Sequence, residues 1–87
     1  MKFPEKVFID FPSDKKGESQ KVPFKAAYYN LMAMTSYDLH NYDMTIKYFE
    51  KALKIYPDFF VAKQNKQAVE IMKKKLEAKE ETPKPTK

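Results

Sequence analysis

Hydrophobic residues recur at helical spacing in the segment 42–56. They step by three, four and three residues: Ile46, Phe49, Leu53 and Tyr56. This spacing predicts a helix with one apolar face. Asn41 can cap the start of that helix because its side chain accepts a backbone N–H. Pro57 ends it, since a proline forces the residue before it away from α geometry.

A second helix is predicted over residues 23–39, with Pro23 in its first turn, where the missing N–H of proline costs nothing. Its apolar residues are Phe24, Tyr28, Tyr29, Leu31, Met32, Met34 and Tyr37, with alanines at positions 26, 27 and 33. They lie almost all round the helix, so we expect it to contact other elements on more than one side. His40 falls in the turn before the next helix and is expected to be solvated.

A third helix is predicted over residues 59–79, with a narrower apolar stripe and a lysine-rich remainder. The stripe consists of Ala62, Val69, Met72 and Leu76. Such a polar outer face suits a helix that closes a helical array against solvent. The last residues are rich in Pro, Lys and Thr, and we predict a disordered tail over residues 80–87.

The N-terminal residues 1–22 have no helical pattern and are predicted to form an irregular or short-strand arm. Val7, Ile9 and Phe11 alternate with Phe8 and Asp10, which is typical of a short strand. A polar loop over residues 13–20, which holds the one glycine of the chain, follows. The fold class is therefore predicted to be all-α, with a helical domain over residues 23–79 behind this arm.

The composition narrows the classes of function. A length of 87 residues permits one small domain, and the absence of cysteine excludes disulfides and thiolate metal sites. The net charge is +5, yet all seventeen basic residues are lysines, which lack the guanidinium fork of base and phosphate recognition. A nucleic-acid partner is therefore disfavoured. No apolar run is long enough to span a membrane, and the lack of cysteine is compatible with the cytoplasm.

The residues of enzyme chemistry are scarce. With His40 as the single histidine and no cysteine, most nucleophile–base pairs and zinc sites are excluded. One glycine does not make a phosphate-binding loop. We expect no enzyme activity, no cofactor and no metal.

The stretch from residue 26 to residue 59 carries residue types at the spacing W-x2-L-G-x2-Y, then A-x3-F, then P. The matching positions are Tyr29, Met32, Ala33, Ser36, Thr45, Phe49, Ala52 and Pro57. The segment 26–59 therefore resembles a tetratricopeptide repeat. Ser36 departs from the pattern, which has an aromatic residue there. Tyr37 comes one residue later, which is about 100° of helix rotation, so it cannot fill the same gap.

The resemblance implies an antiparallel helix–turn–helix hairpin with a third, capping helix over residues 59–79. It also implies a non-catalytic module that binds a protein or peptide on the face of the first helix. The equivalent exposed positions here are Ala27, Asn30, Met34, Tyr37 and Asp38. Some family members clamp a terminal carboxylate with Lys, Arg and Asn at such positions. Only Asn30 could match that pattern, so we expect no carboxylate clamp and a partly apolar groove.

A single repeat leaves apolar surface uncovered, because such units normally stack on neighbours. The arm could fold over this surface, a second copy could pack on it as a twofold dimer, or preceding repeats of a longer protein could cover it. We favour a homodimer. Its expected surface consists of Phe24, Tyr28, Leu31 and Phe60.

Two alternative functions remain open. The chain could be a basic accessory domain that binds nucleic acid or anionic membrane through its third helix and tail. It could also be the repeat-containing tail of a larger protein such as a prolyl isomerase.

Overall fold

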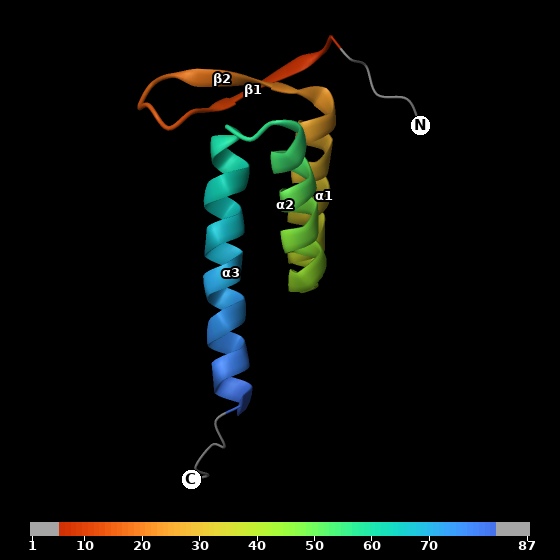
Figure 1. The fold of residues 1–87 in the computed structure, drawn as a ribbon, viewed down its shortest axis with the longest axis vertical. Coiled ribbons are helices and arrows are strands. Elements are labelled where there is room, and N and C mark those ends of the chain that lie inside the picture. The colour runs from red at the N-terminus through yellow and green to blue at the C-terminus, as the bar shows by residue number, and fades with distance from the viewer. Residues whose placement is uncertain (1–5, 82–87) are drawn as a thin grey trace.

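The computed structural model describes residues 6–81 of the chain (Figure 1). Five elements follow one another in the order β1 (Phe8–Pro12), β2 (Ser19–Pro23), α1 (Phe24–Asp38), α2 (Tyr42–Ile55) and α3 (Phe60–Glu81). The predicted fold class is confirmed: two antiparallel helices are joined by a short turn, and a third helix and a short-strand arm accompany them.

Small buried residues hold α1 and α2 close together. Ala33 of α1 and Thr45 and Ala52 of α2 are fully buried, and the Phe49 ring fills the space beside them. The Thr45 hydroxyl is not left unpaired, since it donates to the backbone oxygen of Asn41 at 2.9 Å. The dense interface follows from the alternation of small and large residues, because small side chains let two helix backbones approach.

The turn between α1 and α2 has the expected chemistry. Asn41 caps α2 by accepting the backbone N–H of Met44 on its side-chain oxygen at 3.3 Å. His40 is exposed, as predicted, and its φ of +61° lies in the left-handed region, which is uncommon for residues other than glycine. Its ring lies 3.2 Å from the Tyr42 hydroxyl, measured from Nδ1.

The third helix packs on α2 and extends beyond the α1–α2 turn (Figure 1). Ala62 and Val69, in the inner stripe of α3, are buried. Phe59, the residue before this helix, is fully buried. The helix ends at Glu81, two residues after the predicted end at residue 79. Residues 82–87 of the predicted tail lie outside the described part of the chain.

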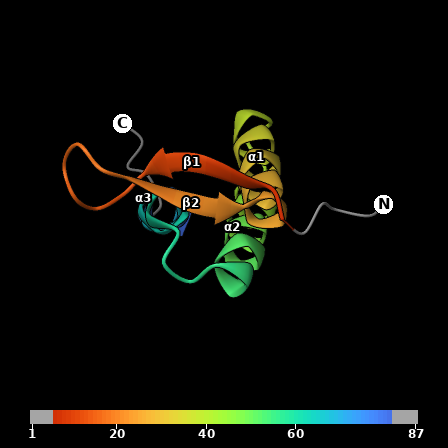
Figure 2. The ribbon, with the colours of Figure 1, turned by 90° about the horizontal axis from the view of Figure 1, so that it is seen from above.

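The arm is an antiparallel hairpin that lies across one end of the three helices (Figures 1 and 2). In its register Phe11 is opposite Gln20 and Ile9 is opposite Val22, so these side chains share the face toward the helices. On the other face, Asp10 and Lys21 form an exposed ion pair at 2.9 Å. The strand β2 was not predicted, because its polar sequence was interpreted as a loop over residues 13–20 followed by the helix start.

The hairpin covers the helix ends and leaves the outer side of α1 uncovered. Phe11 packs edge-on against Phe59, with ring centroids 4.8 Å apart. Leu31, near the middle of α1, remains 61% exposed. The described part of the arm therefore does not cover the apolar surface that α1 exposes around Leu31.

Candidate functional site: a groove between α1 and α3

A groove runs between α1 and α3, with α2 as its floor. Its volume is about 210 Å³, and it is lined by Met34 and Tyr37 of α1, Phe49 of α2, and Asn65, Ala68, Val69 and Met72 of α3. We call it the α1/α3 groove. At about 30 Å³ for each water molecule, the space equals roughly seven waters, which is enough for an apolar side chain.

The side chains that line the α1/α3 groove are uncharged, and two of them are flexible methionines. Two donors face the two thioethers: Asn65 Nδ2 lies 3.9 Å from Met34 Sδ, and the Tyr37 hydroxyl lies 3.9 Å from Met72 Sδ. Thioether sulfur is a weak acceptor, so both donors can take a better partner. Methionine side chains adapt their shape to irregular apolar ligands. The arrangement can therefore hold an apolar group and pair with one or two polar atoms beside it.

Two of the five predicted groove residues line the groove. Met34, which is 40% exposed, and Tyr37, which is half-buried, both do so. Ala27 is half-buried against the core, and Asp38 is exposed at the end of α1; neither lines the groove.

The prediction that Asn30 is exposed was wrong. The residue is only 8% exposed, and its buried Oδ1 atom has no hydrogen-bond partner among the residues that the structure describes. It lies one helical turn before Met34, in the buried stripe that Ala26 and Ala33 continue. Because α1 is apolar almost all round, the polar side chain of Asn30 did not indicate which side of the helix faces solvent.

Sequence reasoning missed Asn65 and Ala68, the α3 residues that face Met34 and Tyr37 across the groove. It treated Val69 and Met72 only as the inner stripe of a cap. The signal was present in the spacing: positions 65, 68, 69 and 72 lie on one face of a helix. What the sequence did not reveal was that this face meets α1 as well as α2.

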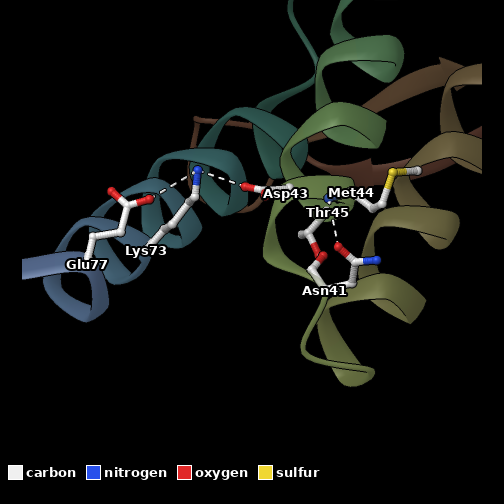
Figure 3. Close-up of polar contacts among 6 residues, drawn as sticks. All are labelled: Asn41, Asp43, Met44, Thr45, Lys73 and Glu77. Atoms are coloured by element: carbon white, nitrogen blue, oxygen red, sulfur yellow. Dashed lines mark hydrogen bonds and ion pairs between the residues drawn. The ribbon is translucent and has the colours of Figure 1, made fainter. Parts of the chain in front are cut away.

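Ion pairs fasten α3 to α2 farther along the helix (Figure 3). Lys73 Nζ lies 2.7 Å from Asp43 Oδ1 and 3.5 Å from Glu77 Oε2. The hydrogen bond and the charge of Asp43, with a smaller contribution from Glu77, raise the pKa of Lys73 above the usual lysine value. Lys66 makes a longer bridge of 3.7 Å to Glu50 of α2. The lysine-rich face thus contributes to the position of α3.

The predicted self-association residues do not form one exposed patch. Leu31 is well exposed, whereas Phe24, Tyr28 and Phe60 are half-buried. Tyr28 packs edge-on against Tyr29, with ring centroids 5.5 Å apart. Leu31 is therefore the well-exposed apolar residue of this set.

Two further features concern chemistry and membranes. Among the side chains that the structure describes, at residues 6–77, no three His, Asp or Glu side chains gather in the geometry of a metal site. None of the helices in this part of the chain combines the length and the hydrophobicity that crossing a bilayer requires.

A comparison with protein families matches residues 26–59 to the family model of the tetratricopeptide repeat. The match begins in α1, includes all of α2 and ends at the residue before α3. It confirms the resemblance drawn from the motif. No curated protein and no solved structure matches the chain.

Proposed function

We propose that this chain, in which residues 26–59 are a tetratricopeptide repeat, is a non-catalytic module that binds a protein partner through the α1/α3 groove. Tetratricopeptide repeats suggest protein–protein interaction in general, and the groove adds a specific place where a partner can bind. The observation that carries the proposal is the uncharged pocket of about 210 Å³ whose walls come from two different helices.

The lining indicates the kind of segment that binds. No lysine among the described side chains lines the groove, so a terminal carboxylate would find no counter-charge in this lining. Met34, Met72 and Phe49 offer an apolar surface to an apolar side chain of an extended peptide. The Asn65 amide, which now contacts only a thioether among the described residues, can donate to a peptide carbonyl. We therefore propose an internal, neutral and apolar segment as the ligand.

The proposal is tested with capped model peptides that carry Leu, Met or Phe between neutral polar residues. Backbone amide shifts of the ¹⁵N-labelled chain are followed during titration. We expect the largest shifts at Met34, Tyr37, Asn65 and Met72. A Met34→Glu variant places a carboxylate at the groove and should abolish the shifts, whereas Met44→Glu, at a half-buried site of α2 outside the groove, should preserve them.

Two results would reject this proposal. One is the absence of shifts with all three peptides. The other is a set of shifts that survives Met34→Glu unchanged, because the ligand would then bind elsewhere.

Self-association is a second candidate function, favoured by the 61% exposure of Leu31 on the outer side of α1. An apolar side chain at the centre of an uncovered helix face can anchor a twofold contact. Light scattering at tens of micromolar should then give a dimer for the native chain and a monomer for Leu31→Glu. Leu39→Glu is the matched control, since Leu39 is 73% exposed but lies in the turn. A monomeric native chain would exclude a dimer.

A nucleic-acid or anionic-membrane partner ranks lower. Two of the α3 lysines, Lys66 and Lys73, already pair with carboxylates of α2 and α3. These pairs reduce the positive charge that α3 offers to phosphate groups.

A further inference from the structure

The two walls of the α1/α3 groove are held apart by other parts of the molecule. α1 packs on α2, and α3 packs on α2. Among the described residues, the hydrogen bonds between α1 and α3 across the groove are the two thioether contacts at 3.9 Å. Contacts of this kind are too weak to define the distance between two helices. The spacing of the walls therefore depends on their packing on α2 and on contacts at the ends of the helices.

At the hairpin end, the side chain of Gln20 in β2 forms two hydrogen bonds with the backbone at the start of α3. Its side-chain Oε1 accepts the backbone N–H of Phe60 at 2.8 Å, and its Nε2 donates to the backbone oxygen of Asp58 at 2.9 Å. The first N–H groups of a helix have no partner inside the helix, so this acceptor satisfies one of them. Phe11, opposite Gln20 in the hairpin, packs against Phe59 and secures the same corner.

The same strand is joined directly to α1. Only three residues separate Gln20 from Phe24, the first residue of α1. Val22, between them, is fully buried, and the backbone N–H of Phe24 donates to the oxygen of Val7 at 2.9 Å. Figure 2 shows the hairpin passing over the start of α3 and reaching the start of α1. A short, buried segment of strand thus connects the first turns of both walls.

We infer that Gln20 is a positioning residue of the α1/α3 groove, which sets the distance between the starts of α1 and α3. The proposed function gives this distance its significance, but the inference concerns the free protein. A glutamine suits the place because one planar amide supplies both the donor and the acceptor. Glutamate would keep the acceptor for Phe60 and turn a carboxylate toward the oxygen of Asp58. Methionine, of similar length, would supply neither bond.

The distance can be measured directly, because the chain has no cysteine that would compete for labels. Lys25→Cys in the first turn of α1 and Lys63→Cys in the first turn of α3 are both exposed positions for a pair of spin labels. Double electron–electron resonance then gives the distribution of distances between the walls without any ligand. Gln20→Met should broaden this distribution and speed hydrogen exchange at the Phe60 amide by at least about tenfold. Gln64→Met makes the same chemical change at an exposed site of α3 and should leave both measurements as they are.

Hydrogen exchange of the α2 amides shows whether each variant is folded. If Gln20→Met does not fold, Gln20→Glu carries the test. It retains the acceptor for Phe60 and should broaden the distances less than Gln20→Met would.

The inference is overturned by a folded Gln20→Met with the distance distribution of the native chain, even if its melting temperature falls. That result would make Gln20 a stabilising residue without a positioning role. Should both variants be unfolded, Gln20 would likewise be needed for folding as a whole, which also contradicts the inference. A failure of the peptide titrations would reject the proposed ligand and leave these distances unaffected.

Discussion

The two sides of α1 are built differently. Where α1 packs on α2, Ala26 and Ala33 of α1 and Thr45 and Ala52 of α2 are all fully buried. Toward α3, Met34 is 40% exposed and its sulfur meets its neighbour at 3.9 Å. One side joins two helices into a dense hairpin, and the other leaves room for a ligand. The comparison teaches that one helix can be closely packed on one face and still line an open groove, because small buried residues and a flexible methionine occupy neighbouring faces of it.

The largest expected effect comes from removing the buried Phe49 ring, which packs in the core beside the small residues of the hairpin and also forms the floor of the groove. Phe49→Ala removes a ring that is 1% exposed, and such truncations cost about 3–5 kcal/mol. A domain of this size has little more stability than that, so we expect a large unfolded fraction at 25 °C. Met34→Ala, on the open side, should cost about 1 kcal/mol or less. Urea denaturation followed by circular dichroism compares the two, and equal losses would contradict the distinction between the sides.

A smaller effect is expected from enlarging an alanine on each side. Ala33→Leu forces a larger side chain between α1 and α2 and should cost about 1–3 kcal/mol. Ala68→Leu places the same atoms at an exposed position of the groove, where there is space for them. It should leave the free energy of unfolding nearly unchanged and weaken peptide binding. Calorimetric melting and the peptide titration distinguish the two variants, and a binding affinity unchanged by Ala68→Leu would argue against the groove.

The buried Asn30 offers a test in the opposite direction. Its Oδ1 has no hydrogen-bond partner within the described part of the chain. A buried unsatisfied acceptor costs about 1–3 kcal/mol, so an apolar residue of similar size should be tolerated or preferred. We expect Asn30→Leu to stabilise the chain by about 1 kcal/mol. Asn30→Asp is the control and should destabilise it, since a carboxylate would be buried there. Both are measured by urea denaturation; a destabilised Asn30→Leu would indicate that the amide has a role that a leucine cannot replace.

The smallest effect concerns the ion pair at Lys73, whose side chain is partly exposed. Its pKa is raised in the folded chain, so its contribution to stability is complete at neutral pH and below the ordinary pKa of lysine. The contribution is lost as the pH rises through the raised pKa. The melting temperatures of the native chain and Lys73→Met should therefore differ slightly at pH 7 and converge in strongly alkaline solution. A difference that persists there would assign the effect to packing of the lysine stem.

Local patterns were sufficient to predict the helices. The stripe of α2, the cap at Asn41 and the stop at Pro57 depend on residues a few positions apart, and α2 begins at the predicted residue. The internal match of the repeat depends on the same short-range spacing. The sequence of β2 has no such pattern. Gln20 and Val22 can be recognised as residues of one buried strand face only when their pairing with β1 is known.

The site was less predictable than the fold. Tyr37 and Met34 were found because the repeat fixes their positions on α1. Asn65 and Gln20 were missed, since their roles arise from contacts with residues more than thirty positions away. The periodicity of residues along one helix does not predict which other helix will pack opposite it, nor the distance between the two helices.

The length of α3 gives the molecule a mechanical property. Its 22 residues correspond to a rod of about 33 Å, gripped at its first turn by the hairpin. A tilt of about 5° around that pivot would move the far end by roughly 3 Å, while the pivot itself stays in place. The ion pair of Lys73 with Asp43 of α2 opposes such a tilt at the other end of the groove. A ligand in the groove, between the pivot and Lys73, would therefore meet a wall that is held at both ends.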